Sequence, residues 1–410
     1  MKIAIIQSRL NGNGGSQRQA IGYAQAFQKL GHEVTLYTIT HDKERCFPEM
    51  TGGLDIVTAP QGFIAPRSLH IPFLGFINYA RYSRAESNAA RRLAQVIATD
   101  TDILHAHDRI AFRVAAYYKR HIRDIPSVLM MSDILTKSWV TWRRAEFDPA
   151  LRPSVKKRFL NWLADSYEIR RFILPHEVIT VLDNRTHKWV KDYFKRNAVI
   201  LRSGLDINHF SFVARSGCSK PVRILMAGIF FLHRRYEDTI EALKFLTDKG
   251  YDVTLTLIGN HKSDQQYRDY YKRLTVRIEE LGLTNRVVCT GEVSEEELRH
   301  AYQTHDIYVS PNHLQSWGLA VFEAMASGAP VIVSKTAGAS EILTDGANAL
   351  LVDGKASEQI AQAIERLATD SKLHAMLSMA GRKFVEENVT WEYSAKNAIA
   401  IFEDCLRKEF

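Results

Sequence analysis

Residues 310–332 read SPNHLQSWGLAVFEAMASGAPVI and form the most informative stretch of the chain. They predict a short strand ending at Ser310, a turn that contains Gly318 and a helix that contains Glu323. Backbone amides at the start of such a helix can hold a diphosphate. A carboxylate one turn further along can accept hydrogen bonds from two ribose hydroxyls. This order of elements therefore suits a nucleoside diphosphate sugar.

The alternation of short aliphatic runs with longer amphipathic stretches recurs from one end of the chain to the other, which is typical of βα units and parallel sheets. A first series of strands is expected at residues 2–7, 33–39, 54–58, 103–106, 127–131, 178–181 and 199–201. A second series is expected at residues 222–227, 253–258, 287–290, 307–310, 330–333 and 349–352. Helical patterns between them include residues 16–30, 73–98 and 155–172.

Residues 214–221 form a polar stretch that interrupts the alternation and is typical of a linker. We therefore predict an α/β protein with two Rossmann-like, doubly wound parallel-sheet domains that face each other across a cleft. The expected boundaries are residues 1–210 and 211–390. Residues 391–410 are expected to form a helix that packs back toward the N-terminal domain.

The turn at residues 11–16 follows the first strand and opens a helix. Gly14 and Gly15 would let backbone amides approach a phosphate or a sugar closely, with the positive potential of the helix N-terminus behind them. A dinucleotide fingerprint is the alternative, but Gln17 stands at its third glycine. In isolation, the same turn is equally well explained as a tight connection.

The chain resembles the retaining nucleotide-sugar glycosyltransferases of glycosyltransferase family four, which have the two-domain GT-B fold. Their hallmark is a pair of glutamates within a Glu-x-Phe-Gly-Leu-x-x-x-Glu-Ala-Met-Ala-x-Gly-x-Pro-Val frame. This sequence keeps the frame except at the first glutamate and the phenylalanine, which are Gln315 and Trp317. The likeness extends to residues 14–35, 102–108, 203–210, 287–293 and 306–311.

The resemblance assigns the donor site to the C-terminal domain and the acceptor side to the N-terminal domain. It implies that Glu323 binds the donor ribose and that Gly318 and Leu319 offer amides to the diphosphate. Val293 would face the nucleobase through its backbone. Gly14 and the following glycine would contribute to donor binding from the other domain.

The family's phosphate-binding cations follow a strand glycine, which is Gly228 in this chain. Ile229 stands where the family has an arginine, and Arg234 stands where it has a lysine. One cation is therefore lost. We expect Arg235 to replace it, because a guanidinium can bind phosphate in a bidentate way.

Two residues are expected to act on the sugar. Gln315 replaces a glutamate that accepts a hydrogen bond from the donor sugar, and an amide can still accept one without carrying charge. We expect activity to be retained, with weakened activity or a changed donor preference as the open alternatives. His107 follows the strand at residues 103–106 and matches a histidine that touches the sugar near the reacting centre. Alternatively, His107 or His105 is a core histidine.

The resemblance implies a metal-independent hexosyltransferase that needs no cofactor and takes a UDP-, GDP- or ADP-linked sugar as its donor. The acceptor would be a glycan or a lipid-linked molecule in the synthesis of cell-surface polysaccharide or glycoconjugates. A nucleotide-sugar epimerase and a catalytically silent sugar-binding protein of the same fold remain alternatives. The broken fingerprint disfavours a NAD-dependent enzyme.

Charge and cysteine content bear on partners and compartment. Residues 1–210 contain 31 Lys and Arg against 19 Asp and Glu, whereas the remainder contains 23 against 27. The basic residues come as scattered pairs without a nucleic-acid-binding motif, so no nucleic acid is expected. An anionic membrane surface or a phosphorylated acceptor explains the charge better. Four scattered cysteines and no secretory signal predict a cytoplasmic protein, with peripheral contact at the inner membrane face as a further expectation.

Two further motifs are open to misinterpretation. Residues 100–102 spell the Asp-x-Asp of metal-dependent glycosyltransferases, but they precede a strand instead of following one and are expected to form an exposed turn. Residues 73–84 are aromatic and basic, like an interfacial anchor. The alternative for them is a helix packed on its own sheet.

Overall fold

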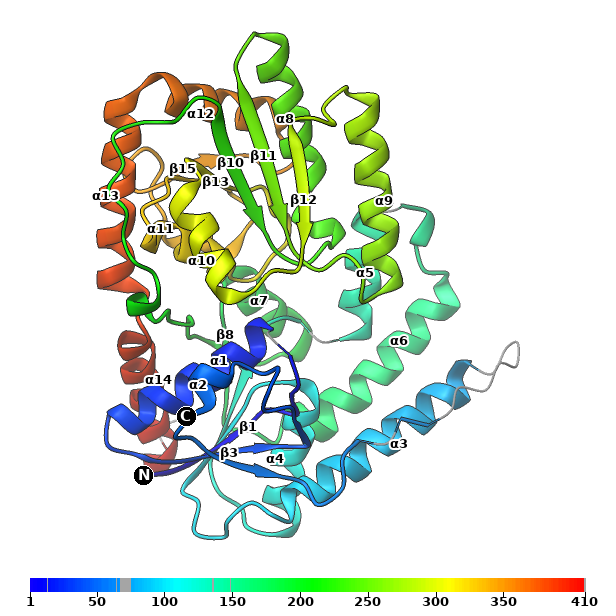
Figure 1. Cartoon of the computed structure of the whole chain (residues 1–410). Helices are drawn as coiled ribbons and strands as arrows, with labels where there is room; N and C mark the ends of the chain where they lie inside the picture. Colours follow the sequence, from blue (N-terminus) through cyan, green and yellow to red (C-terminus); the bar gives the residue numbers. More distant parts are fainter. Residues whose placement is uncertain (13, 64, 67–74, 135, 148, 409–410) are drawn as a thin grey trace. The chain divides into compact units, whose positions relative to one another are not determined.

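The computed structural model describes residues 1–12, 14–63, 65–66, 75–134, 136–147 and 149–408 (Figure 1). Its contacts divide the chain into two compact units. Unit 1 comprises Met1–Gly204 and Trp391–Phe410, and unit 2 comprises Leu205–Thr390. The break lies at residue 204 and not at the expected residue 210. The reason is that the Leu205 amide donates to the Val389 carbonyl at 2.8 Å and Arg382 donates to the Phe210 carbonyl at 2.7 Å.

Unit 1 is built on a seven-stranded parallel sheet with the order β5-β3-β1-β6-β7-β8-β9. The bounds are β1 Lys2–Ile6, β3 Glu33–Thr38, β5 Asp55–Thr58, β6 Ile103–Ala106, β7 Ser127–Met131, β8 Val178–Val181 and β9 Val199–Ile200. These agree with the predicted strands to within a residue at either end. A separate pair joins β2 Arg9–Leu10 to β4 Thr40–His41, and two-residue strands like these leave no pattern in the sequence.

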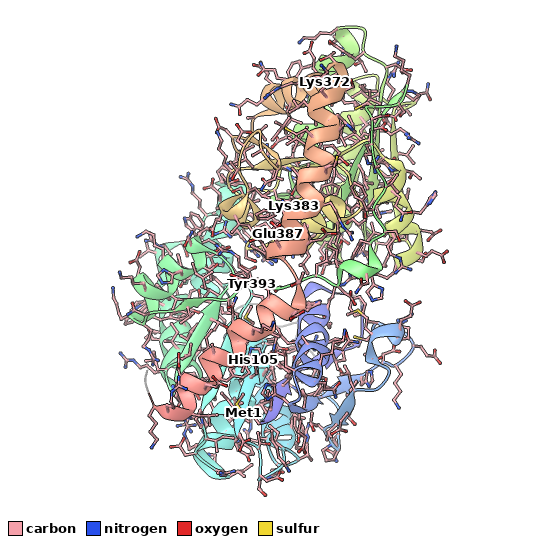
Figure 2. The ribbon with its side chains drawn as sticks, turned by 90° about the vertical axis from the view of Figure 1, so that its left-hand side faces the viewer. Met1, His105, Lys372, Lys383, Glu387 and Tyr393 are labelled. Atoms are coloured by element: carbon pink, nitrogen blue, oxygen red, sulfur yellow. The ribbon has the colours of Figure 1, made fainter. Side chains whose placement is uncertain are left out.

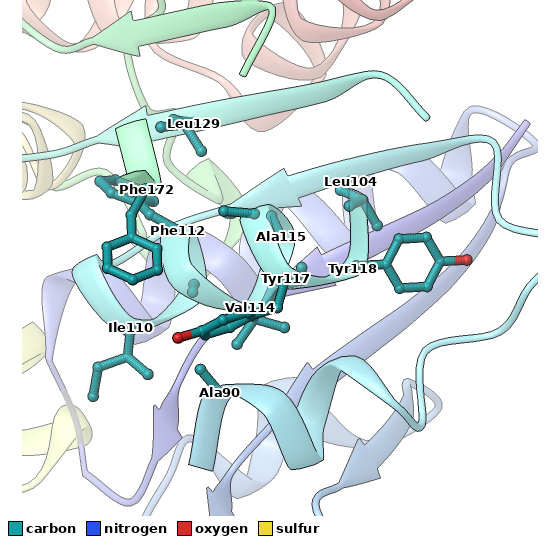
Figure 3. Close-up of a cluster of buried hydrophobic side chains, with 14 of the residues drawn as sticks. Ala90, Leu104, Ile110, Phe112, Val114, Ala115, Tyr117, Tyr118, Leu129 and Phe172 are labelled. Carbon is teal, nitrogen blue, oxygen red and sulfur yellow. The ribbon is translucent and has the colours of Figure 1, made fainter. Parts of the chain in front are cut away.

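The helices of unit 1 are α1 Gly15–Lys29, α2 Pro48–Thr51, α3 Gly75–Ala94, α4 Arg109–His121, α5 Lys137–Phe147, α6 Val155–Glu168, α7 Asn184–Trp189 and α14 Trp391–Arg407. Strands β6, β7 and β8 are buried along their whole lengths, as in parallel sheets covered on both faces. Figure 3 shows part of this core, where Tyr118 of α4 lies near Leu104 of β6 and Phe112 lies near Phe172.

Two predicted helices differ at their ends. α6 stops at Glu168, and the expected continuation to residue 172 is a π-helical segment, Ile169–Ile173. α3 stops at Ala94, because the amide of Val96 bonds back to Leu93 and tightens the last turn. The sequence pattern predicted a helix up to residue 98 because Ile97 is buried like a helix residue, although it lies in the turn after α3. Residues 73–74 lie outside the described part of the chain.

The C-terminal helix α14 belongs to unit 1 and packs on α1. A Cβ placed on Gly22 would overlap the Trp391 indole, whose Cδ2 would be 2.8 Å away. Further along, the rings of Phe402 and Phe27 are 5.4 Å apart. Figure 2 follows the chain from Lys372 in α13 to Tyr393 in α14, which then runs across the part of unit 1 that contains His105.

Unit 2 is built on a six-stranded parallel sheet with the order β12-β11-β10-β13-β14-β15. The bounds are β10 Val222–Ala227, β11 Val253–Ile258, β12 Val287–Gly291, β13 Ile307–Ser310, β14 Val331–Ser334 and β15 Leu350–Val352. Its helices are α8 Tyr236–Asp248, α9 Gln265–Glu280, α10 Glu295–Thr304, α11 Leu319–Ala326, α12 Ser357–Thr369 and α13 Ser371–Asn388.

The polar stretch at residues 214–221 is not a linker between the units. It lies within unit 2, where Arg215 donates to the carbonyls of Gly328, Tyr302 and Gln303 at 2.7–3.0 Å. Polar composition predicted a linker, but the half-buried Arg215 guanidinium and the Ser219 hydroxyl, which donates to Asp306, fasten the segment to the unit. Sequence patterning does not reveal such a contact.

The structure also describes residues 100–102 and part of residues 73–84, the two motifs open to misinterpretation. Asp102 accepts a hydrogen bond from the Lys2 amide at 2.7 Å, and Asp100 pairs with the Lys2 ammonium at 2.5 Å, so both carboxylates fasten the start of β1. Residues 73–84 fall largely in α3, but residues 73–74 and the side chains at 75–77 and 79 lie outside the described part of the chain. Tyr82 is half-buried, as expected of a helix that packs on its own unit. Among the described segments, no helix is long and apolar enough to cross a bilayer.

Candidate functional site

Most of the predicted site residues lie where the strand order of a sheet reverses. In unit 2, β10 lies between β11 and β13, and the loops after β10 and β13 contain Arg234 and Gln315. In unit 1, β1 lies between β3 and β6. Gly14 lies in the connection from β1 to α1, and His107 directly follows β6. Open α/β sheets bind ligands beyond the carboxyl ends of strands at such points.

The loop after β10 holds Arg234 against the backbone of Gly228. Gly228 has φ 151°, and a Cβ there would lie 2.8 Å from the Arg234 guanidinium carbon. Tyr236, fully buried at the start of α8, donates to the Gly228 carbonyl at 2.6 Å. Within the described structure, the buried Nε of Arg234 has no hydrogen-bond partner. A cation with an unused donor therefore lies beside an exposed turn of backbone.

Arg235 is engaged differently. Its guanidinium donates to both oxygens of Asp238, at 2.5 and 3.0 Å, and pairs with Glu237 at 2.7 Å. Burial alone would lower the pKa of Arg235, but the two carboxylates raise it above its ordinary value. The structure thus assigns Arg235 an ion-pair role at the start of α8. The expectation that it replaces a lost phosphate ligand stays a prediction, and these contacts count against it.

The loop between β13 and α11 positions Gln315. Leu314 adopts a left-handed conformation with φ 61°, which a side chain accepts only where its surroundings impose it. The Gln315 carbonyl accepts from the Gly338 amide at 2.9 Å, and its side-chain oxygen accepts from the Asn312 amide group. The same oxygen lies 3.2 Å from where a Cβ of Gly318 would stand. Gln315 is therefore fixed at both ends, beside the start of α11.

The N-terminus of α11 has the features of an anion site. Gly318 caps the helix at φ 95° and brings no side chain to the first turn, which contains no acidic residue. The first amides of a helix have no intrahelical acceptor, and the helix dipole adds positive potential. Gly318 is required here because a side chain at this φ is strained and would also press on Gln315. Leu319 follows as the first helical residue.

Glu323 lies one turn into α11 and is 6% exposed. Its carboxylate accepts a hydrogen bond from Tyr302 of α10 at 2.9 Å. Nearby, burial raises the pKa of Tyr308 above its ordinary value, while Arg234 acts to lower it and Glu323 to raise it. Arg234 and Glu323 therefore act on the same phenol, which belongs to the second residue of β13.

A backbone contact joins the two loops of unit 2. The His313 amide, in the loop after β13, donates to the His233 carbonyl, in the turn that contains Arg234, at 2.7 Å. Val293 lies half-buried in the loop after β12. Hence the structure brings Arg234, Gln315 and Glu323 to one edge of the sheet, with Val293 two strands away on the same edge.

In unit 1, Gly14 caps α1 and Gly15 is its first residue. A Cβ on Gly14 would overlap the amide group of Gln17, whereas a Cβ on Gly15 would meet nothing within 4 Å. Neither has a positive φ. Because the Gln17 side chain is flexible and can move aside, local packing requires glycine at neither position.

His107 directly follows β6, but its side chain is 2% exposed, so it does not stand clear of the fold as an open cleft residue would. Its Nε2 lies 3.1 Å from Nδ1 of the fully buried His105. Burial lowers the pKa of His107 to about 3. Its Nδ1 has no hydrogen-bond partner among the residues that the structure describes. His107 is a neutral ring with one unused polar atom, and His105 fits the core alternative.

The structure also shows a cavity of about 230 Å³ in unit 1 that sequence reasoning missed. Its lining includes Arg109 at the start of α4, Lys137 at the start of α5, and Asp165 and Glu168 on α6. Arg109 pairs with Glu168 at 3.7 Å and with Glu86 at 2.5 Å. The charges nearly balance, so the cavity does not call for an anionic ligand. No local pattern joins these residues, because they come from three helices.

Two family models match the chain. The model described as Glycosyltransferase Family 4 matches residues 13–179, and the model described as Glycosyl transferases group 1 matches residues 214–384. Together they span most of units 1 and 2. The chain therefore belongs to the family-four type of glycosyltransferases.

Similar proteins of known sequence or structure support this assignment. A glycosyltransferase of Methanocaldococcus jannaschii is 23% identical over 402 residues, covering 95% of this chain and 94% of its own. A phosphatidyl-myo-inositol mannosyltransferase of Mycobacterium leprae is 24% identical over 347 residues, covering 83% and 82%. The crystal structure of Anabaena HepE in complex with UDP and glucose matches with a TM-score of 0.72 at 18% identity, covering 98% and 99%. The fold is therefore GT-B.

Proposed function

We propose that this glycosyltransferase takes a nucleoside diphosphate sugar as donor and transfers the sugar with retention of its anomeric configuration, without a metal ion. The main support is the arrangement in unit 2, where Arg234 follows β10 and the glycine-capped start of α11 with Glu323 follows the neighbouring strand β13, and a backbone hydrogen bond from His313 to His233 joins the two loops. The amides at the start of α11 suit the diphosphate of such a donor, and Glu323 suits its ribose. Arg234 suits the negative charge that grows on the diphosphate as the sugar leaves.

In this proposal the amides at Gly318 and Leu319 and the guanidinium of Arg234 hold the diphosphate. The unused Nε–H of Arg234 supplies a donor that costs no existing hydrogen bond. Glu323 exchanges or shares its bond to Tyr302 when it accepts from the ribose hydroxyls. The backbone at Val293 faces the base.

Gln315 is proposed to accept a hydrogen bond from the donor sugar, and its bond to Asn312 fixes the amide so that it can do so with little loss of entropy. On unit 1, His107 is proposed as the catalytic residue that contacts the sugar, and Gly14 and Gly15 as further donor ligands. With its pKa lowered, His107 acts as a neutral hydrogen-bonding group and not as an acid. The departing phosphate helps to deprotonate the acceptor.

The decisive experiment incubates the protein with UDP-, GDP- and ADP-linked hexoses and follows nucleoside diphosphate release with and without candidate glycan and lipid-linked acceptors. We expect acceptor-dependent release with one base, unchanged by EDTA, and a product whose anomeric carbon keeps the donor's configuration by NMR. An inverted product or an EDTA-sensitive rate would refute the mechanism. A thermal-shift screen with UDP, GDP and ADP identifies the base first.

A catalytically weak or silent sugar-binding protein is the second candidate. Two observations favour it: Ile229 occupies the position of a phosphate-binding arginine and is 37% exposed, and Gln315 replaces a glutamate. Binding of a nucleotide without turnover on any donor would support it. Release of free sugar with a changed C2 configuration would instead indicate the epimerase alternative.

The variant Gln315→Glu separates these candidates. If the glutamine is a working ligand, turnover should change by less than about tenfold, because both groups accept the same hydrogen bond and a neutral substitute costs less than a lost catalytic group. A rise of tenfold or more on every donor would mean that the natural residue impairs catalysis. Gln315→Ala, which removes the acceptor, is the matched variant and should lower turnover.

On the acceptor side, we propose a glycan or lipid-linked acceptor in cell-surface polysaccharide or glycoconjugate synthesis at the cytoplasmic face of the membrane. The support is the excess of basic residues in the N-terminal half and the likeness to the Mycobacterium leprae relative, a phosphatidyl-myo-inositol mannosyltransferase. Assays with lipid-linked and water-soluble acceptors compared side by side would test this.

A further inference from the structure

Helix α6 is held in unit 1 by its polar face. Asp165 accepts from the amides of Lys137 and Ser138 at 2.7 and 2.9 Å and so caps α5. Asn161 donates to Thr141 at 2.9 Å. Glu168, one turn after Asp165, pairs with the fully buried Arg113 at 2.6 Å. The side of α6 that faces the protein is therefore made of charged and amide groups.

The opposite side of α6 is apolar and faces solvent. We call it the α6 outer face, and it consists of Val155, Phe159, Leu160, Trp162, Leu163 and Tyr167. Val155 is 81% exposed, Phe159 57% and Trp162 49%. The spacing i, i+4, i+7 and i+8 places the valine, the phenylalanine, the tryptophan and Leu163 in one stripe. An ordinary surface helix has this polarity reversed, with the apolar stripe turned inward.

The helix does not need this stripe for its own attachment. Its inward hydrogen bonds and ion pair already fix it, and on the opposite side the rings of Phe159 and Trp162 stack with their centroids 5.9 Å apart. Large apolar surfaces left exposed on a soluble protein mark an interaction site. Figure 1 shows α6 as a long rod at the margin of unit 1, next to α5.

Basic residues surround the stripe. Arg152, Lys156, Lys157 and Arg158 are all exposed, and the sequence has no acidic residue between positions 149 and 164. The partner must therefore offer an apolar region for the aromatic and aliphatic side chains and negative charge for the basic residues beside them. An anionic bilayer surface offers negative headgroups next to a boundary where Trp and Tyr side chains are favoured.

We propose that the α6 outer face docks on an anionic lipid bilayer, with the four basic residues contacting headgroups and Phe159 and Trp162 inserted at the interface. Charge argues against a second copy of the chain, because a symmetric contact through α6 would bring eight cations together without an acidic partner in the same segment. The aliphatic members of the stripe argue against a nucleic acid, which has no apolar boundary to receive them. The proposal holds whichever sugar the enzyme transfers.

The test is flotation of the full-length protein with vesicles of phosphatidylglycerol and phosphatidylcholine, compared with vesicles of phosphatidylcholine alone. We expect the wild type to float with the anionic vesicles and to stay in solution with the neutral ones. Phe159→Ser/Trp162→Ser and Lys156→Glu/Lys157→Glu/Arg158→Glu should each reduce binding about tenfold or more. Because these side chains are exposed, thermal melts of the variants should match the wild type.

Matched variants separate this surface from general stickiness. Val276→Ser/Val288→Ser removes two other exposed apolar side chains, and Lys372→Glu/Lys383→Glu/Lys396→Glu makes the same change in net charge elsewhere. Both should bind vesicles like the wild type. Equal loss in the controls, or a wild type that stays in solution with anionic vesicles, would overturn the proposal. So would a concentration-dependent dimer in sedimentation that Phe159→Ser/Trp162→Ser abolishes in the absence of lipid.

Insertion itself has an optical signature. Vesicles with brominated acyl chains quench tryptophan that reaches the interface, and the chain has six tryptophans. We expect quenching in the wild type and its loss in Trp162→Phe, which keeps an aromatic ring and so keeps flotation. Quenching that survives this change would place the membrane contact on another part of the chain.

Discussion

Arg234 and Arg235 are neighbours in sequence, yet their surroundings differ completely. Arg235 is held by Asp238 and Glu237, whereas Arg234 lies on the Gly228 backbone with an unused Nε–H. A charge already paired with two carboxylates has little left for a phosphate. A charge with an unused donor can bind one more readily.

We expect Arg234→Ala to weaken nucleoside diphosphate binding by about tenfold or more, because it removes a charge-assisted hydrogen bond. Arg235→Ala should leave binding almost unchanged and lower the free energy of unfolding by about 2 kcal/mol, because Asp238 is then buried without its cation. Calorimetric titration with the nucleotide and thermal melts measure the two effects. Loss of binding in Arg235→Ala at unchanged stability would restore it as a phosphate ligand.

The buried histidines of unit 1 predict how stability depends on pH. Burial lowers the pKa of His107 to about 3, while the unfolded chain takes up the proton near the ordinary value of about 6.5. Between these values the unfolded state binds more protons, so the free energy of unfolding falls as pH drops below about 6.5. For one such histidine the loss is about 2 kcal/mol at pH 5.

Denaturant unfolding of the wild type, His107→Gln and His121→Gln between pH 7 and pH 5 measures this effect. His121 is exposed on the same unit and is the control. We expect the slope of stability against pH to become shallower in His107→Gln and to stay the same in His121→Gln. His176, also buried with its pKa lowered to about 3, keeps part of the slope in every variant. Equal slopes in all three proteins would contradict the buried neutral state of His107.

How much of the site the sequence could predict depends on the range of its contacts. Gln315, Gly318 and Glu323 lie within one strand-turn-helix unit, so their spacing was sufficient to bring them together. Tyr302, which binds Glu323, comes from the preceding helix, and no pattern of spacing connects the two. Arg235 and Asp238 are three residues apart, so their ion pair could be predicted from spacing. The resemblance to the family favoured phosphate binding for Arg235 instead.

On the scale of elements, the strands were predictable and the helix ends were not. A buried parallel strand is a continuous apolar run with sharp limits, so the prediction for β6, β7 and β8 agrees with the structure residue by residue. Helix ends depend on caps and tertiary contacts. α3 ends where its last turn tightens, and α6 changes into a π-helical segment within an unbroken apolar pattern.

The packing of α14 on α1 gives a prediction with an internal control. Glycine to alanine inside a helix normally stabilises it by about 1 kcal/mol. At Gly22 the added methyl would overlap the Trp391 indole, so we expect Gly22→Ala to destabilise unit 1 by about 1–3 kcal/mol. Gly15→Ala, on the same helix but in open space, should be neutral or stabilising.

Thermal melts compare the two alanine variants directly. Trp391→Leu provides the cycle partner, because a smaller side chain makes room for the methyl. Gly22→Ala should therefore cost less in that background than in the wild type. An equal cost in both backgrounds would show that the indole is not the obstacle.

On the scale of the whole molecule, the last helix completes unit 1 although unit 2 separates it in sequence. Removing residues 391–410 would uncover the rings of Phe27 and His105, which Phe402 now contacts at centroid distances of 5.4 and 5.1 Å. We expect this truncation to destabilise unit 1 selectively and to leave unit 2 protected in hydrogen exchange followed by mass spectrometry. Uniform loss of protection in both units, or none, would contradict the division of contacts.

Because the chain leaves unit 1 at residue 204 and returns to it at residue 391, unit 2 is an insertion between two parts of one folding unit. During synthesis the ribosome adds every residue of unit 2 before it reaches α14. The sheet of unit 1, although made first, therefore has the apolar side chains of α1 uncovered until unit 2 has been translated. The part of the protein that is translated first thus acquires its last helix only after the other part has been made, and its exposed apolar surface is the one open to misassembly during that interval.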